Sequence, residues 1–188
     1  MIIDLLRREH RNIEKLLLVL EKELNVFDRG EQPDYEVIRA VIAYFEVYPE
    51  IYHHPQEDVV FRKLQARDSA AAAVIGDLAA EHRRGAERLR KVSQAIETVL
   101  ADRIIPRQAV DSIIRDFIGR ERQHIAMEER AFFPAAVAAL QPQDWSEIAS
   151  ALTEPKRDPL FSEIVEQQFD VVRNHILRLE QEAEVERA

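Results

Sequence analysis

The chain contains no cysteine among its 188 residues. This absence excludes disulfide frameworks, zinc–thiolate sites, cysteine nucleophiles and thiolate-bound iron clusters. Glycine is scarce, with four residues, and aromatic residues make up only 7% of the chain, so the sequence offers neither a glycine-rich phosphate-binding loop nor runs typical of β-strands. Ala, Leu, Glu, Arg and Gln dominate instead, and this composition predicts helix throughout.

Basic residues are fewer than acidic residues, with 26 Lys and Arg against 35 Asp and Glu. The formal net charge is −9, which disfavours non-specific binding to nucleic acid or to an anionic membrane surface. No apolar run reaches the roughly 18 residues of a membrane span, and charges from Asp4 onward replace the apolar stretch of a signal peptide. We therefore expect a cytoplasmic protein. Its 46% hydrophobic residues are sufficient for a sizeable globular core.

Apolar residues recur at alternating steps of three and four in four long segments of residues 1–140. This is the period of a helix with one buried face. Turn signals separate the segments at 28–34 and 102–106, and a start signal for the third helix lies at Asp68 or Ser69. Short connections make consecutive helices antiparallel. The sequence therefore predicts an all-α fold, with an up-down-up-down four-helix bundle over residues 1–140.

Residues 141–188 are expected to form a C-terminal helical extension. A short helix is predicted from about Gln143, then a linker at 153–161, then a helix over Ser162–Glu184 whose apolar face includes Ile164. One or two additional helices would thus follow the bundle. They are expected to pack either on the bundle or on a second subunit, which would give a homodimer through the C-terminal helices.

The bundle segment contains an internal repeat. The stretch LRREHRNIEKL resembles LAAEHRRGAERL further along the chain, and EIYHHPQEDVVF resembles ERQHIAMEERAFF. Each predicted helical hairpin therefore carries one lone histidine and one His-x-x-x-Glu pair. This repetition indicates a bundle with an approximate two-fold relation between its halves.

The repeated histidines and glutamates are predicted to point into one core. Residues four apart lie on the same face of a helix, and these pairs and lone histidines all fall on apolar faces. At about 1.5 Å per residue, each histidine lies roughly 27–29 Å from the turn that closes its hairpin. The predicted metal ligands are His10, His53, Glu57, His82, His124 and Glu128.

Metal ions would remove the energetic cost of burying these groups, which is high when they lack partners. Imidazole suits iron, zinc, copper and nickel, and a carboxylate can bridge two ions. Two ions, each held by two histidines and bridged by both glutamates, use the whole set. Such a centre leaves open positions for a small ligand.

The repeated pattern of a lone histidine and a His-x-x-x-Glu pair resembles the hemerythrin-like family of HHE cation-binding domains. The resemblance covers about residues 1–140. It implies two non-haem iron ions, oxo- or hydroxo-bridged when oxidised, and a protein that binds, senses or detoxifies O2, peroxide or nitric oxide. Whether the protein is an enzyme stays open. Reversible oxygen carriage is disfavoured, because Ala86 stands where the oxygen carriers have a second histidine, and Glu128 follows His124 at four residues where they have an aspartate at five.

A ferritin-like di-iron oxidoreductase is the main alternative. Glu50 and Glu121 each stand in a Glu-x-x-His spacing, which is used by ferritin-like bundles. Glu9 and Glu81 would supply the remaining carboxylates, although each lies about 100° from the inward face of its helix. Otherwise Glu50 and Glu121 would hold imidazole N–H groups or lie on the surface. A regulatory module whose metal is mainly structural is a further alternative.

Three other features carry predictions. His54 follows His53 directly and is about 100° from it around a helix, so we expect it at the rim of the centre or directly behind the ligands, and less readily as the ligand in place of His53. Pro49 and Pro55 predict a distorted helix around the ligands. His175 is expected at the surface or at an interface.

Overall fold

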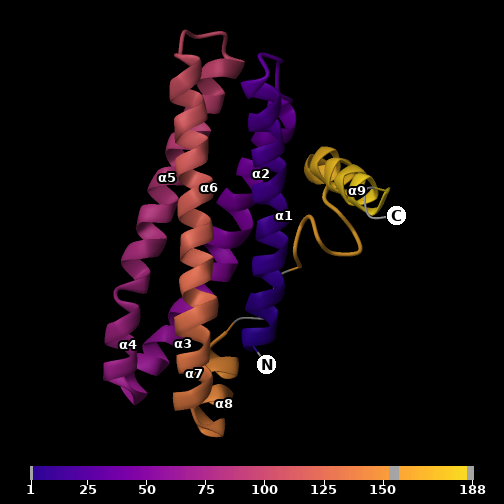
Figure 1. The fold of residues 1–188 in the computed structure, drawn as a ribbon. Coiled ribbons are helices and arrows are strands. Elements are labelled where there is room, and N and C mark those ends of the chain that lie inside the picture. Colours follow the sequence, from indigo (N-terminus) through magenta and orange to yellow (C-terminus); the bar gives the residue numbers. More distant parts are fainter. Residues whose placement is uncertain (1, 153–156, 186–188) are drawn as a thin grey trace.

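The computed structural model describes residues 2–152 and 157–185, and all regular structure within these ranges is helical. The all-α class is therefore confirmed. Four long helical columns form the body of the molecule (Figure 1). The columns are α1 (Ile2–Asp28); α2 (Tyr35–Tyr48) with η1 (Pro49–His53) and α3 (His54–Arg67); α5 (Leu78–Leu100); and α6 (Arg107–Met127) with η2 (Glu128–Phe132) and α7 (Phe133–Ala139).

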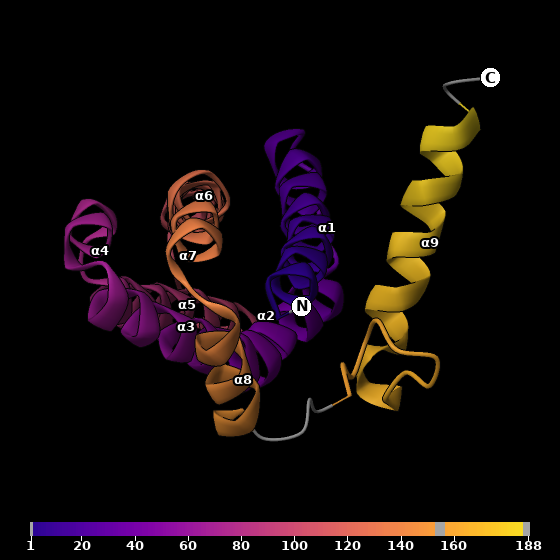
Figure 2. The same cartoon turned by 90° about the horizontal axis from the view of Figure 1, so that it is seen from below.

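The columns pack around one core in the order of the chain. α1 contacts α2, α2 contacts α5, α5 contacts α6, and α6 returns to α1; Figure 2 shows the columns from below. The buried apolar side chains form two clusters, one toward each end of the columns. On α1, Leu6 belongs to one cluster and Ile13 to the other, with His10 between them. A polar layer thus separates the two apolar parts of the core.

The second column widens where the sequence has two prolines. Pro55 has no N–H to donate, and in a regular helix its ring would clash with the Ile51 carbonyl. Within η1 the N–H of His54 donates to the Pro49 carbonyl, five residues back, which is the π-helical pattern. The distortion predicted from the prolines is confirmed, and this π-turn ends at His53.

A second π-turn, η2, lies in the fourth column. The N–H of Phe133 donates to the Glu128 carbonyl, and Pro134 comes directly afterwards. As in η1, the wider turn accommodates a residue that cannot donate a backbone hydrogen bond. Both π-turns adjoin predicted ligands, because η1 ends at His53 and η2 begins at Glu128.

The third predicted helix is divided into α4 (Ser69–Ile75) and α5, so the prediction of one continuous helix is wrong. Asp68 caps α4 by accepting a hydrogen bond from the Ala71 N–H, which agrees with the predicted start. Gly76 then takes a φ of +91°, a conformation that glycine adopts without a steric penalty. Asp77 caps α5 directly afterwards, so the Gly-Asp pair ends one helix and starts the next.

Helix α8 (Pro142–Ala151) follows the fourth column and packs against α3, where Ile148 is buried. Its start agrees with the prediction near Gln143. Part of the predicted linker, residues 153–156, lies outside the described residues. The division of the chain at residue 140 stays a prediction.

The last helix begins later than predicted. The segment expected to start it is a loop, closed by a hydrogen bond from the Glu166 N–H to the Pro159 carbonyl. Ile164, expected on the buried face, is 68% exposed. A short 3-10 turn, η3 (Gln167–Phe169), leads into α9 (Asp170–Val185). The apolar residues of this segment have a helical spacing, but the segment forms a loop.

Helix α9 packs on α1 and α2 of the same chain (Figures 1 and 2). Val172 and Ile176 belong to the apolar cluster that contains Ile13, and Lys15 of α1 forms an ion pair with Glu180. In this structure the C-terminal segment contacts the bundle of its own chain. A homodimer through these helices stays a prediction.

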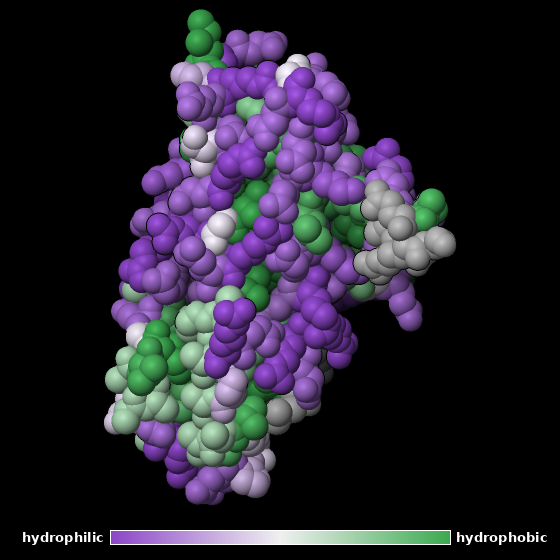
Figure 3. Space-filling view, viewed as in Figure 1, coloured by the Kyte–Doolittle hydropathy of each residue, from purple (hydrophilic) through white to green (hydrophobic). Residues whose placement is uncertain are grey.

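The face of the molecule in Figure 3 is mostly hydrophilic, and apolar residues gather toward the end where α4 and α7 lie. Val74 of α4 and Val137 of α7 are among the exposed apolar residues. Among the described residues, no helix combines the length and the apolar character that a bilayer-spanning helix requires.

Candidate metal centre

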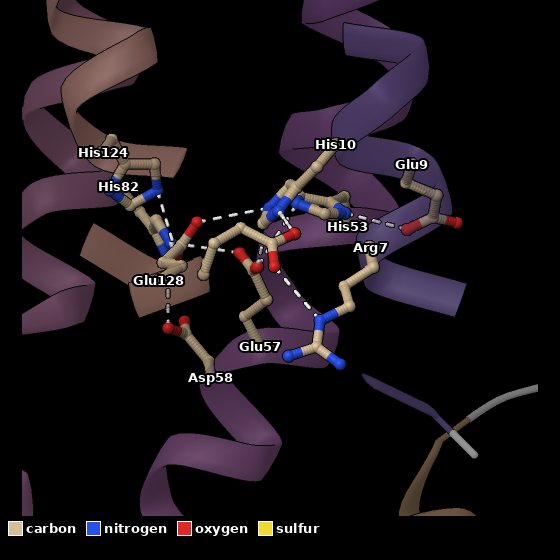
Figure 4. A network of polar contacts seen from close by, with 10 residues as sticks. Arg7, Glu9, His10, His53, Glu57, Asp58, His82, His124 and Glu128 are labelled. Carbon is tan, nitrogen blue, oxygen red and sulfur yellow. Dashed lines mark hydrogen bonds and ion pairs between the residues drawn. The ribbon is translucent and has the colours of Figure 1, made fainter. Parts of the chain in front are cut away.

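The six predicted ligands meet in the polar layer between the two apolar clusters (Figure 4). Their side chains are almost entirely removed from solvent: His10 is 3% exposed, and Glu57 and Glu128 are 0% exposed. They come from all four columns: His10 from α1, His53 from η1, Glu57 from α3, His82 from α5, His124 from α6 and Glu128 from η2.

The Glu57 carboxylate lies between two groups of imidazoles. Its Oε1 is 3.4 Å from Nε2 of His10 and 3.3 Å from Nε2 of His53. Its Oε2 is 3.4 Å from Nε2 of His82. One oxygen therefore faces the histidines on the α1 side, and the other faces the α5 side.

The Glu128 carboxylate is arranged in the same way. Its Oε2 is 3.3 Å from Nε2 of His10. Its Oε1 is 3.2 Å from Nε2 of His124 and 3.6 Å from Nε2 of His82. The two glutamates thus stand side by side between the His10–His53 pair and the His82–His124 pair.

These inward-facing atoms have no hydrogen-bond partners. Both oxygens of Glu57, both oxygens of Glu128, and Nε2 of His10, His82 and His124 are buried and make no hydrogen bond. Buried polar atoms are normally hydrogen-bonded, because an unsatisfied one costs free energy. A set of buried oxygens and imidazole nitrogens that converge without hydrogen bonds fits bound metal cations.

Comparison with known proteins agrees with this geometry. The family model described as the hemerythrin HHE cation-binding domain matches residues 1–136, which is well over half of the chain. The chain belongs to the hemerythrin HHE family. No curated protein and no solved structure gave a match. The matched residues contain all six predicted ligands, so the His/Glu layer lies within a cation-binding domain.

The outward-facing Nδ1 atoms of the HHE domain are held by a second set of acids. Nδ1 of His53 lies 2.8 Å from Oε2 of Glu9, and the Tyr48 hydroxyl donates to the other oxygen of Glu9 at 2.8 Å. An acid that binds the far N–H of a ligating histidine fixes its tautomer and orientation. Glu9 therefore positions His53.

The same arrangement links the two halves of the repeat. Nδ1 of His82 lies 3.1 Å from Asp58, and Nδ1 of His10 lies 2.9 Å from Glu129. The sequence interpretation missed both acids. A signal was present, because an acidic residue directly follows each glutamate of the two His-x-x-x-Glu pairs. Each acid holds the lone histidine of the opposite hairpin.

Without a metal ion, the buried carboxylates would favour protonated imidazoles in this layer. Burial lowers the pKa of His10, but the adjacent Glu128 and Glu57 carboxylates outweigh burial and raise this pKa to about 11. Burial likewise lowers the pKa of His53, while Glu57 and Glu9 raise it to about 9. Contacts with Asp58, Glu128 and Glu57 outweigh burial and raise the pKa of His82 to about 11. Metal binding must displace these protons.

The carboxylates of the ferritin-like alternative do not converge on this centre. Glu81 forms an ion pair with Arg84 at the surface, and Glu9 is occupied by His53 and Tyr48. Among residues 2–152 and 157–185, the groups with metal-ligand spacing are His10, His53 and Glu57, and His54, Glu57, His82 and His124. Glu50 and Glu121 belong to neither group, which favours the hemerythrin-type ligand set.

Two histidines outside the predicted ligand set differ in position. His54 does not lie at an exposed rim: it is buried, 6% exposed, and its ring stacks on that of His82 with centroids 4.2 Å apart. His175 lies where α9 meets α1, 3.7 Å from Glu23. His175 was expected at the surface or at an interface, and it lies at an interface between two helices of the same chain.

A solvent-open pocket reaches the edge of the centre at His124. It has a volume of about 430 Å³ and is lined by residues of α4, α5 and α6, with Arg84, Arg88 and Arg120 among them. His124 is the most exposed of the predicted ligands, with 12% of its side chain accessible. Water and small molecules therefore have a route to the His82–His124 side of the HHE domain.

Proposed function

We propose that this HHE domain is a non-haem di-iron protein that handles O2, peroxide or nitric oxide, built as an up-down-up-down bundle of the hemerythrin type. One ion would lie between His10 and His53 and the other between His82 and His124. Glu57 and Glu128 would bridge them. The observation that carries the proposal is the pair of buried carboxylates whose four oxygens face both histidine pairs without any hydrogen bond.

The donor set supports iron among the available metals. Thiolate ligands are excluded because cysteine is absent, and a hard cation such as Mg²⁺ or Ca²⁺ would be bound by oxygens rather than by imidazoles. A mixed set of imidazoles and carboxylates with open positions suits non-haem iron. When bound, iron would supply redox chemistry toward a small diatomic ligand or peroxide.

The protein's own residues support this role in three ways. The apolar clusters on either side of the layer exclude bulk water from the centre. The acids Glu9, Asp58 and Glu129 orient imidazoles through Nδ1, so that Nε2 points inward. The pocket at His124 offers access for a small molecule.

Metal analysis tests the proposal first. Protein purified without added metal, or reconstituted with ferrous iron under argon, should contain about two iron ions per chain. His82→Ala should lower this content, whereas His175→Ala, which changes a histidine outside the centre, should leave it unchanged. A chain that takes up no iron at micromolar concentrations would overturn the proposal.

Reactivity then separates the remaining roles. The reduced protein is mixed with O2, H2O2 or nitric oxide in a stopped-flow spectrometer. A spectral change that stops after one equivalent indicates a binding or sensing protein, and repeated consumption of H2O2 or nitric oxide indicates an enzyme. Iron that reacts with none of the three would overturn the proposed handling of small ligands and indicate a structural metal.

A further inference from the structure

His54 lies inside the centre, although the six-ligand pattern does not use it. Its ring is parallel to that of His82, with an interplanar angle of 13°, and stands edge-on to His124 at 5.9 Å. The preceding residue, His53, contacts His10 instead, with ring centroids 5.0 Å apart. Two consecutive residues at the end of the η1 π-turn therefore turn toward the two different halves of the centre.

Nδ1 of His54 faces an acid, as Nδ1 of His53 and of His82 does. Nδ1 of His54 is buried, makes no hydrogen bond and lies 3.4 Å from a carboxylate oxygen of Glu50. In the same way, Nδ1 of His53 faces Glu9 and Nδ1 of His82 faces Asp58. An imidazole buried in a core without a fully formed hydrogen bond is costly unless another partner is present.

We propose that His54 is a third imidazole ligand, bound to the ion between His82 and His124. This inference rests on the proposed function, because it presupposes two bound ions. Donor atoms of His54, Glu57, His82 and His124 all lie within 4.8 Å of one another. That spacing allows a single ion to contact all of them after small side-chain movements.

The two halves of the repeat differ at this side of the centre in a second way. Glu9 holds Nδ1 of His53, but its counterpart Glu81 forms an ion pair with Arg84. Nδ1 of His124 is buried without a hydrogen bond. His124 thus lacks an acid corresponding to Glu9 on His53, and the ring of His54 lies beside it instead. In the repeat, Ile125 occupies the position that corresponds to His54.

An unequal centre follows from this assignment. The ion beside His54 would have three imidazoles and two carboxylate oxygens, and the ion beside His10 and His53 would have two of each. In an octahedral coordination the second ion keeps more open positions.

Two substitutions separate ligation from packing. His54→Phe keeps a flat ring that can stack on His82 but has no nitrogen, whereas His54→Ala removes both the ring and the donor. Each variant is loaded with ⁵⁷Fe, checked for helix content by circular dichroism, and titrated against a chromophoric chelator. Mössbauer spectra of the loaded proteins report the environment of each ion. His175→Ala is the control for loss of a histidine elsewhere.

Both His54 variants are expected to lower the binding affinity for one of the two ions by about tenfold to a hundredfold, the scale seen when support of a metal site is lost. They are also expected to alter one of the two Mössbauer signals. The other signal and His175→Ala should match the wild type. Wild-type affinities and spectrum in His54→Phe would overturn the assignment and leave His54 a packing role. Failure of the wild-type chain to bind two ions would instead overturn the proposed function, before any His54 variant is compared.

Discussion

Replacing Glu57 by glutamine is expected to weaken the binding of both metal ions, because Glu57 belongs to both groups of potential ligands. Its side chain is fully buried, and its two oxygens lie 3.3–3.4 Å from the Nε2 atoms of His10, His53 and His82. Glutamine preserves the size of the side chain. It removes the negative charge and places an NH2 donor where an acceptor oxygen faced the metal position.

The size of the effect follows from the share of binding energy that each ligand carries. A structural zinc site with four ligands contributes about 10–16 kcal/mol, or roughly 3 kcal/mol per ligand. A loss of about 3 kcal/mol corresponds to an affinity about a hundredfold lower. Glu57→Gln should therefore weaken each ion by about a hundredfold, whereas His124→Ala, which changes a member of only one group, should mainly weaken one ion.

The assay is a competition titration against a chelator of known affinity, with metal content per chain measured in parallel. Glu23→Gln is the matched control, because Glu23 is 5% exposed but lies away from the centre, where it accepts a hydrogen bond from the Asp34 N–H. Its metal affinities should equal those of the wild type. Two ions bound with wild-type affinity in Glu57→Gln would refute the bridging role.

Three further outcomes are expected. Glu9→Gln removes the charge that holds Nδ1 of His53 and should lower metal affinity about 10–100-fold in the same titration; unchanged affinity would contradict a positioning role. In the metal-free protein the pKa values of His53 and His10 are raised from 6.5 to about 9 and about 11. The stability that their protons contribute is therefore complete below pH 6.5 and is lost as the pH rises through 9 toward 11. Urea unfolding at pH 6.5 and pH 10 measures this loss, and an equal or higher stability at pH 10 would be inconsistent with it. Phe169→Ala, at a fully buried position of the C-terminal segment, should cost about 3–5 kcal/mol, seen as a lower melting temperature. A loss below 1 kcal/mol would indicate that the segment does not pack on the bundle as described.

The ligand residues were predictable from the sequence because their signals are local. A His-x-x-x-Glu pair on an apolar face must point inward wherever the helix packs, and the internal repeat places both pairs at one height. The structure brings together His10, His53, Glu57, His82, His124 and Glu128. Their role as metal ligands stays a proposal.

The acids around the ligands were harder to predict because they act across helices. Asp58 reaches His82 on α5, and Glu129 reaches His10 on α1. Such contacts depend on the distance and rotation between packed helices, which a single sequence does not encode in its spacing. The burial of His54 was missed for a related reason: the regular 100° step places it outside, but the π-turn before it changes the direction of the following side chains.

The sequence by itself determined the helical class, the four long segments and the inward faces with their histidines and glutamates, since periodicity and residue spacing act within one helix. Only the tertiary structure decided which oxygen faces which imidazole and which acid holds Nδ1 of each lone histidine. These features depend on contacts between segments far apart in the chain. The energies of such contacts arise only when the columns are packed together, so no local pattern could reveal them.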